Sequence, residues 1–204
     1  MVLECIIGIG GNMVIGIDLD DTITNSFEDL MPLFARFFNL DLEYCIEHKY
    51  SYNNFPVDLK DRQKEFFKYL KENRLLSKIT VKEDAIQVLK ELRDLGFKII
   101  IITSRNDSLL PDAYTETKKY LDENGIPYDE LYCEHDKHKI LVSEGVDVFI
   151  DDSLKGLLYN KDACTHHILF NSVLNIQEET YFKRASSWRD IKTIVTKLNK
   201  GLHM

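Results

Sequence analysis

The sequence lacks the features that mark membrane-spanning, secreted or disulfide-linked proteins. Its longest apolar stretch, around residues 99–102, has the length of a strand and does not approach the roughly 18 residues of a membrane span. The four cysteines form no Cys-x-x-Cys pair, and Glu4 stands where a secretory leader would carry an early Lys or Arg. We therefore expect a reduced, cytoplasmic protein with no membrane partner.

Positive charge is also scarce, because 26 Lys and Arg residues are outnumbered by 34 Asp and Glu residues and the formal net charge is −8. Such a balance disfavours a nucleic-acid polymer or an anionic membrane as a partner. A small anionic substrate would need a local positive group or a metal ion. With 204 residues, of which 44% are hydrophobic, the chain is long enough for one core domain with an insertion.

Residues 1–12 have no visible structural role, since the first apolar strand begins cleanly at Met13. Gly10, Gly11 and Asn12 can be encoded by a purine run of the kind that forms a bacterial ribosome-binding site. Our hypothesis is that the native chain starts at Met13 and that residues 1–12 are a mis-assigned start; the intact mass of the protein from its host tests this. A dinucleotide-binding glycine loop is disfavoured, because such a loop follows a strand and opens a helix.

From Met13 onward the pattern alternates between apolar strands and amphipathic helices. Continuous Val and Ile runs are typical of strands buried on both faces of a parallel sheet. Strands are expected at residues 14–17, 97–102, 129–132, 147–150 and 166–170. Helices are expected at residues 81–96, from Pro111 to Gly125, from Lys137 to Glu144 after a capping Asp136, and after a capping Ser187.

One interruption, residues 25–77, has helical rather than alternating periodicity. Phe27, Leu30, Met31, Phe34 and Phe38 recur at three- and four-residue steps, and residues 58–76 form a second amphipathic pattern. The segment between these patterns, residues 50–56, has the Pro and Asn content of a loop. Aromatic residues concentrate here, so we expect a helical insert with its own apolar interior.

Two carboxylates follow the first strand at once. Asp18 and Asp20 lie where reactive groups of open α/β sheets are found, just past the carboxyl end of a strand. Two crowded anions persist only with a cation between them or with a proton on one of them. The alternative is a plain helix start, in which Asp20 or Asp21 caps the next segment.

Three more polar groups follow later strands: Thr103, Ser104 and Arg105, then Lys137 or Lys139, then Asp151 and Asp152. Together with the motif of residues 18–22, Asp-Leu-Asp-Asp-Thr, this order resembles the haloacid dehalogenase-like phosphohydrolase superfamily over residues 13–170. The resemblance implies an α/β fold, a Rossmann-like doubly wound parallel sheet. Residues 13–24 and 78–204 would form the catalytic core, and residues 25–77 a small helical cap inserted after strand 1.

The resemblance also implies roles for these residues. Asp18 would be the nucleophile that forms an aspartyl phosphate, and Asp20 the acid and base. The Thr103 hydroxyl, a lysine ammonium and backbone N–H groups of the loop after Asp18 would meet the charge of the transition state, and Thr103 and Ser104 would contact the substrate. Lys137 is favoured over Lys139 because it opens a helix and so points toward the strand ends.

Magnesium is the cofactor that the resemblance implies, since it prefers oxygen ligands. Asp18, the backbone carbonyl of Asp20 and Asp152 would bind the ion, with Asp151 behind them. Asp21 is expected to be a solvated or capping residue. Cys133, His135 and His138 lie close in sequence, but a fourth zinc ligand is missing, so an exposed polar loop is preferred there.

The insert would select the substrate. Among subfamilies, the sequence is similar to the 5′(3′)-deoxyribonucleotidases, which implies a small phosphorylated metabolite and specifically a nucleoside monophosphate. Its base would stack on Phe27, Tyr50, Tyr52 or Phe55. Aromatic residues at helical spacing more often pack than recognise a ligand, however. Arg105 would either clamp a second anionic group of the substrate or pair with a surface acid.

Other functions remain open at this point. They are a phosphatase of another small metabolite, a phosphomutase, and a non-catalytic binding protein with the same fold. A receiver domain is disfavoured, because it is shorter, has no insert and carries its acid pair on a different strand. The oligomeric state is left open, with a homodimer as the candidate.

Overall fold

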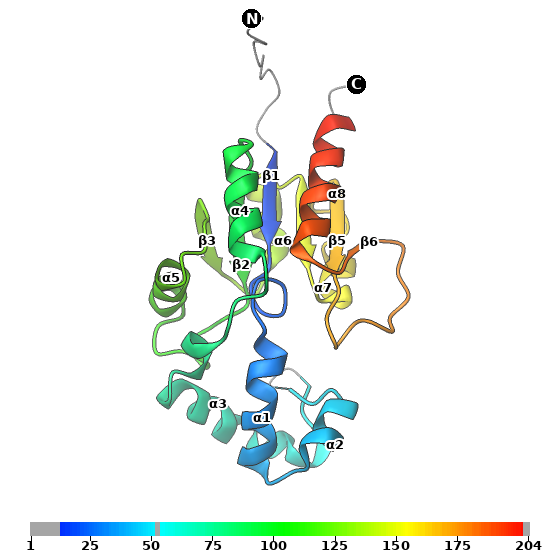
Figure 1. Cartoon of the computed structure of the whole chain (residues 1–204). Helices are drawn as coiled ribbons and strands as arrows, with labels where there is room; N and C mark the ends of the chain where they lie inside the picture. Colours follow the sequence, from blue (N-terminus) through cyan, green and yellow to red (C-terminus); the bar gives the residue numbers. More distant parts are fainter. Residues whose placement is uncertain (1–12, 52–53, 202–204) are drawn as a thin grey trace, which may run out of the picture.

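The computed structural model describes residues 13–51 and 54–201. The hypothesis about residues 1–12 lies outside the described residues, as does Tyr52. No helix of the described part has the length and apolar character to cross a membrane. Figure 1 shows a sheet with helices packed on it and a separate group of helices beyond the carboxyl ends of the strands.

The sheet has six parallel strands in the order β3-β2-β1-β4-β5-β6. The central strand β1 lies between β2 and β4, because Ile17 pairs with Ile101 on one side and with Ile150 on the other. This arrangement confirms the predicted doubly wound α/β fold. The strands are β1 (Val14–Ile17), β2 (Lys98–Thr103), β3 (Glu130–Cys133), β4 (Val148–Asp151), β5 (His166–Phe170) and β6 (Lys183–Ala185).

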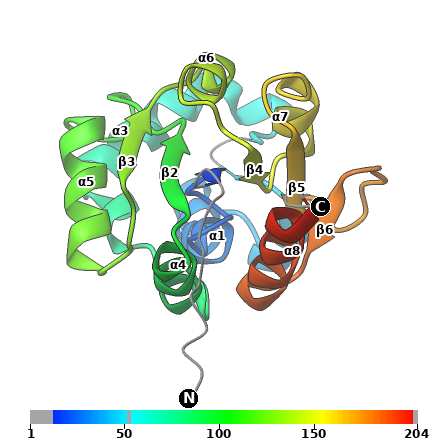
Figure 2. The same ribbon diagram turned by 90° about the horizontal axis from the view of Figure 1, so that it is seen from above.

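Helices cover both faces of the sheet, as Figure 2 shows from above. Alternate strand residues supply each face: Ile99 and Ile101 pack with one apolar cluster, and Ile100 and Ile102 pack with another. The helices of the first cluster are α4 (Ala85–Asp94), α5 (Ala113–Glu123) and α8 (Trp188–Gly201). Those of the second cluster are α6 (Lys137–Ser143) and α7 (Leu154–Tyr159).

Leu141 of α6 and Val146, which follows the helix, pack against Gly16 of β1. A side chain at Gly16 would come within 3.1 Å of Leu141 and 3.2 Å of Val146, so only glycine fits at this position without displacing its neighbours. Lys137, the first residue of α6, reaches Asp18 directly after β1, which matters for the site described below.

The helical insert has an apolar interior of its own. Its elements are α1 (Ser26–Phe38), α2 (Leu42–Glu47), the 3-10 helix η1 (Val57–Arg62), α3 (Gln63–Glu72) and the 3-10 helix η2 (Leu75–Lys78). Phe34 and Phe66 are almost fully buried, with ring centroids 5.3 Å apart and an edge-to-face arrangement. The helical periodicity of residues 27–38 therefore identified the buried face of α1 correctly.

Two short connections join the insert to the sheet. Thr24 and Val81 form an antiparallel bridge, Asn25 N donates to Thr80 O at 2.9 Å, and Lys82 N donates to Ile23 O at 2.9 Å. The two connections thus run side by side at the end of β1. Leu174, from the loop between β5 and β6, also packs against the apolar interior of the insert.

Several local predictions were wrong. The helix expected at residues 58–76 is divided into η1, α3 and η2, and the left-handed Arg74, with φ 48°, separates α3 from η2. Pro111 precedes α5 instead of lying in its first turn, since the side chain of Asp112 caps that helix through Thr115 N. Asp136 precedes α6, yet its side chain makes no capping hydrogen bond. Ser187 does cap α8, accepting from Asp190 N at 3.1 Å.

Candidate active site

Three of the four predicted polar groups lie on strand ends at the carboxyl edge of the sheet, and the fourth, Lys137, reaches them from α6. Asp18 directly follows β1, Thr103 is the last residue of β2, and Asp151 is the last residue of β4. Because β1 lies between β2 and β4, these strand ends are adjacent, and Asp18 N donates to Ile150 O at 2.9 Å. The parallel topology therefore converts sequence positions more than 80 residues apart into neighbours.

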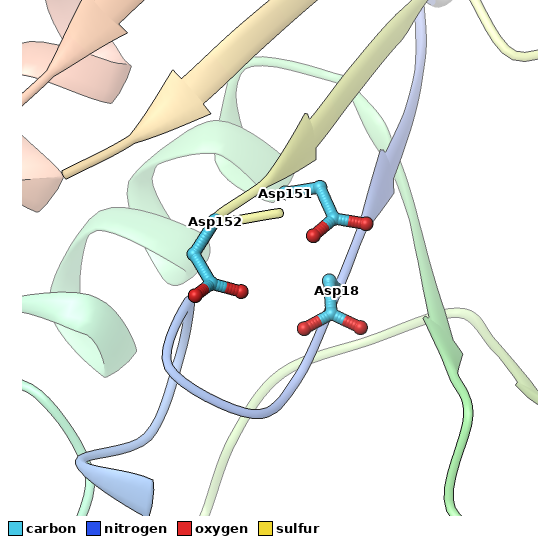
Figure 3. Close-up of side chains that lie close together, drawn as sticks. All are labelled: Asp18, Asp151 and Asp152. Atoms are coloured by element: carbon cyan, nitrogen blue, oxygen red, sulfur yellow. The ribbon is translucent and has the colours of Figure 1, made fainter. Parts of the chain in front are cut away.

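Asp18, Asp151 and Asp152 form an acidic triad. One carboxylate oxygen from each residue lies within 4.8 Å of the other two. Figure 3 shows Asp18 facing the Asp151–Asp152 pair from the end of the neighbouring strand. Asp18 and Asp151 are buried, so their mutual repulsion is only weakly screened by water.

Lys137 neutralises part of this charge. Its Nζ donates to Asp18 Oδ1 at 2.5 Å and to Asp151 Oδ2 at 2.9 Å. Burial by itself would lower the pKa of Lys137, but the two carboxylates outweigh it and raise the pKa. Lys139 is exposed on the same helix. The structure therefore places Lys137, and not Lys139, at the triad.

One ammonium group does not balance three carboxylates. Burial, with the adjacent charges of Asp151 and Asp20, raises the pKa of Asp18 to about 7 despite the opposing effect of Lys137. Burial and the charge of Asp151 likewise raise the pKa of Asp152 well above its usual value. A further cation would restore the ionised forms, so the donor set fits a hard divalent metal ion.

The two members of the Asp151–Asp152 pair have different hydrogen bonds. Asp151 uses both carboxylate oxygens within the protein, since Oδ2 accepts from Lys137 and Oδ1 accepts from Ser153 N at 2.8 Å. Within the described residues, the carboxylate of Asp152 accepts from a single donor, the Ser172 hydroxyl at 3.2 Å. Asp152 is therefore the better placed of the two to bind a metal ion directly, with Asp18 opposite.

Asp20 is not part of the triad and forms a separate ion pair. Arg105 Nε donates to Asp20 Oδ2 at 2.9 Å, and Arg105 Nη2 donates to Asp20 Oδ1 at 2.8 Å. Ser26 Oγ adds a third hydrogen bond to Oδ1 at 2.6 Å. Burial would raise the pKa of Asp20, but Arg105 outweighs burial and lowers it. Among the described residues, the acid that pairs with Arg105 is thus Asp20 at the site and not an acid on the protein surface.

The loop after Asp18 is held in place by side chains. Asp21 has a left-handed backbone with φ 60°, and its carboxylate accepts from Phe27 N at 2.7 Å, so it caps α1. Thr22 Oγ1 accepts from Asp152 N at 3.1 Å, which ties this loop to the end of β4. Trp188 Nε1 donates to the carbonyl of Thr22 at 3.2 Å.

The hydroxyl residues after β2 lie beside the site. Thr103 is buried, and its Oγ1 accepts from Arg105 N at 3.3 Å. Ser104 is half-buried, and its carbonyl accepts from Asn106 Nδ2 at 3.2 Å. Neither hydroxyl is among the hydrogen-bond donors to the triad within the described residues.

Sequence reasoning missed the residues that support Asp152. Ser172 donates to its carboxylate, and the buried Asn175 donates from Nδ2 to Asp152 O and to Phe170 O, both at 2.7 Å. Arg184 in turn donates from Nη1 to Asn175 Oδ1 at 3.1 Å. The available signal was the polar Asn-Ser pair that directly follows β5 at the same edge of the sheet.

The aromatic residues proposed to stack on a base lie in different surroundings. Phe55 is buried among the rings of the insert, 5.2 Å from Phe34 between centroids. Tyr50 is half-buried and packs against His48, with centroids 5.4 Å apart. Phe27 lines a small cavity together with Ser26 and other residues, with a volume of about 10 Å³, roughly enough for one water molecule.

The Cys133, His135 and His138 group does not assemble a metal site. In the described part of the chain, the acidic triad is the one group of three or more potential ligands close enough to share an ion. Cys133 instead donates its thiol to Ala113 O at 3.5 Å, and His135 is exposed.

The fold is shared with many solved structures. A haloacid dehalogenase-like hydrolase from Streptococcus pneumoniae superposes with a TM-score of 0.64 at 13% identity, covering 90% of this chain and 98% of that one. A predicted phosphoglycolate phosphatase from Haemophilus somnus superposes with a TM-score of 0.64 at 16% identity, covering 92% of this chain and 100% of that one. A phosphatase from Thermococcus onnurineus superposes with a TM-score of 0.58 at 20% identity, covering 90% of this chain and 97% of that one.

At such identities these likenesses establish the fold alone, and no curated protein matches the sequence. The model of one protein family matches residues 12–200, which is nearly the whole chain. That family is described as 5′ nucleotidase, deoxy (Pyrimidine), cytosolic type C protein. The chain belongs to this 5′-nucleotidase family and is a phosphomonoester hydrolase, and it has the fold of a haloacid dehalogenase-like hydrolase.

Proposed function

We propose that the protein is a magnesium-dependent phosphomonoesterase that works through an aspartyl phosphate on Asp18. One observation carries the proposal: a buried carboxylate at the end of the central strand is held by Lys137 and faces Asp151 and Asp152. A nucleophile needs fixed orientation and a local excess of positive charge to approach an anionic phosphate. Lys137 supplies one such charge, and the triad is built to take a second.

In this proposal Asp18 attacks phosphorus with one carboxylate oxygen as the bond from phosphorus to the leaving oxygen breaks. Lys137 and the Thr103 hydroxyl stabilise the negative charge that builds up on the phosphoryl oxygens. Mg²⁺, held by Asp18, the Asp20 carbonyl and Asp152, would neutralise the substrate phosphate and the acidic triad. Asp151 keeps Lys137 oriented between the two strand ends.

Asp20 moves the protons. It would protonate the leaving oxygen in the first half-reaction and take a proton from the hydrolytic water in the second, which releases phosphate and restores Asp18. Splitting the displacement into two steps lets the same carboxyl group serve as acid and then as base.

The substrate we propose is a nucleoside monophosphate, which the family supports. Of the candidate stacking residues that the structure describes, Phe27 is the one that lines the small cavity together with Ser26 and Asp21, so it is the proposed contact. One observation favours a second candidate, a phosphate ester without a base: Phe55 is committed to the interior of the insert, and the cavity is too small to be a preformed base slot.

A panel of phosphomonoesters tests these proposals. Nucleoside 5′- and 3′-monophosphates, sugar phosphates and p-nitrophenyl phosphate are assayed with Mg²⁺ and with excess chelator, using wild type and Asp18→Asn. We expect hydrolysis of nucleotides that needs Mg²⁺ and is lost in Asp18→Asn while the circular dichroism spectrum stays unchanged. Full turnover by the variant would mean that another group attacks phosphorus. Product analysis with a phosphorylated acceptor separates a phosphatase from a phosphomutase.

A further inference from the structure

We propose that Arg105 is a positioning residue for Asp20: it holds the carboxyl group at the leaving-group side of the site and does not itself bind the substrate phosphate. This inference rests on the proposed function, which makes Asp20 the acid and base. It replaces both earlier interpretations of Arg105, as a clamp for a second anionic group and as a partner of a surface acid.

The first support is the geometry of the pair. Two adjacent guanidinium nitrogens of Arg105 each donate to a different oxygen of Asp20, at 2.9 and 2.8 Å. A two-pronged contact of this kind fixes both the distance and the plane of the carboxylate, which a lysine would not do. The Arg105 side chain is 1% exposed and that of Asp20 is 14% exposed. Asp20 thus keeps some access to the site while Arg105 lies behind it.

The second support is that Arg105 is itself immobilised. Its guanidinium lies over the ring of Tyr120, 5.2 Å from the centroid. Tyr120 is 1% exposed and donates its hydroxyl to Ile79 O at 2.9 Å, so the ring is fixed as well. Arg105 N donates to Thr103 Oγ1, which anchors the backbone at the end of β2. A group held this firmly can transmit its orientation to Asp20.

The third support comes from the insert. Ser26, the first residue of α1, donates to the same Asp20 oxygen at 2.6 Å, and its hydroxyl lies 2.8 Å from that of Thr24. Asp20 is therefore held between the loop after β2 and the first turn of the insert. Its orientation depends on contacts from both parts of the molecule.

The burial of Arg105 opposes a direct role in substrate binding. In the described part of the chain, Nε and Nη2 of Arg105 are occupied by Asp20, so a phosphate that bound these two nitrogens would displace the group that the reaction needs beside the leaving oxygen. Loss of Arg105 should therefore affect proton transfer to the leaving group more than phosphate binding.

Leaving-group dependence distinguishes these roles. p-Nitrophenolate departs as an anion and needs little help from an acid, whereas an alkoxide needs a proton. The experiment measures kcat/KM of Arg105→Lys for p-nitrophenyl phosphate and for the alkyl phosphate that wild type hydrolyses fastest. Because kcat/KM reports the first phosphoryl transfer, the later hydrolysis of the aspartyl phosphate does not enter.

We expect kcat/KM to fall by roughly tenfold or more for the alkyl phosphate and by less than about threefold for p-nitrophenyl phosphate. Asp20→Asn should show the same pattern with larger losses, and Arg105→Lys should cost nothing further in the Asp20→Asn background. Arg189→Lys is the matched control, because Arg189 makes the same two-pronged contact with Asp84 on the surface, both bonds at 2.9 Å. It should leave both rates unchanged.

Equal losses on the two substrates, or an undiminished further loss in the Asp20→Asn background, would overturn the inference. If Arg105→Lys fails to fold, Ser26→Ala makes the same test, since it removes one hydrogen bond to Asp20 and should give a smaller loss with the same leaving-group pattern. Failure of the proposed function looks different: Asp18→Asn would then retain turnover on both substrates, whatever Arg105→Lys does.

Discussion

The carboxyl edge of the sheet and the interior of the insert are both buried, but they are built from opposite kinds of side chain. At the sheet edge, carboxylates are paired with Lys137 and Arg105 through short hydrogen bonds. In the insert, Phe34, Phe38 and Phe66 pack edge to face or tilted, with centroids 4.8 to 5.5 Å apart. Charged groups suited to chemistry therefore gather at the sheet edge, whereas the interior of the insert is apolar packing.

The physical costs of the two regions differ accordingly. Burying charged groups costs several kcal/mol per ion before pairing, and a buried ion pair seldom adds net stability. Burying an aromatic side chain instead stabilises the fold by about 1.5 to 3 kcal/mol. We therefore expect substitutions at the sheet edge to change activity first, and substitutions in the insert to change the free energy of unfolding first.

The largest effect is expected at Lys137. Lys137→Met removes the charge that holds Asp18 and Asp151, and kcat should fall by roughly 10²- to 10³-fold or more, as when a group that stabilises transition-state charge is lost. Lys139→Met is the matched control on the same helix and should keep wild-type kcat, because Lys139 is exposed. A greater loss of kcat in Lys139→Met than in Lys137→Met would show that Lys139 is the catalytic lysine.

The second effect concerns the insert. Phe66→Ala leaves a cavity among packed rings and should lower the free energy of unfolding by about 3 to 5 kcal/mol in chemical denaturation. Phe67→Ala should lower the free energy of unfolding by less, because the neighbouring Phe67 is only partly buried. Activity per folded molecule should remain near wild type at low temperature. A loss of kcat without a loss of stability would break the separation of the two regions.

The third effect is on metal affinity. Asp152→Asn should weaken Mg²⁺ binding by about 100-fold or more, whereas Ser172→Ala, which removes only the hydrogen bond that orients Asp152, should weaken it by about tenfold. Isothermal titration of the protein without substrate measures both. Equal Mg²⁺ affinities in wild type and Asp152→Asn would show that Asp152 does not bind the ion.

The smallest effect is on substrate choice. Phe27→Leu keeps an apolar side chain beside the cavity but loses the ring, so KM for nucleotides should rise by about fivefold, or about 1 kcal/mol, at the lower end of base stacking. KM for p-nitrophenyl phosphate should change less. Phe55→Leu should lower stability and leave KM for nucleotides unchanged. A raised KM for nucleotides in Phe55→Leu, with an unchanged KM in Phe27→Leu, would assign substrate contact to Phe55 instead.

The elements that the sequence could predict are those with a continuous apolar or periodic pattern. The strands β1, β2 and β4 are mainly apolar runs with Asp18, Thr103 and Asp151 at their carboxyl ends, so the local pattern predicted these strands and the polar groups that end them. Strand β6, with the sequence Lys-Arg-Ala, has no such pattern, because it lies at the edge of the sheet. Helices α2 and α7, six residues each, are too short for a periodic signal.

The partner of Arg105 could not be predicted, because Asp20 is 85 residues away and the pairing depends on how two loops fold over the sheet edge. The same holds for Asn175, which lies 23 residues beyond Asp152 in a loop without periodicity. The sequence placed Phe27 on an expected helix face and Phe55 in an expected loop, but it did not show which ring lines a cavity. The structure separates them by their place in the insert, one beside a cavity and one among other rings.

The most direct test of the central claim is to trap the phosphorylated carboxylate. The protein is mixed with substrate and Mg²⁺, quenched, and treated with borohydride, which reduces an aspartyl phosphate to homoserine. Peptide mass spectrometry then locates the change. The account predicts homoserine at position 18 in wild type and none in Asp18→Asn. Rapid turnover with homoserine at another aspartate, or at none, would contradict it.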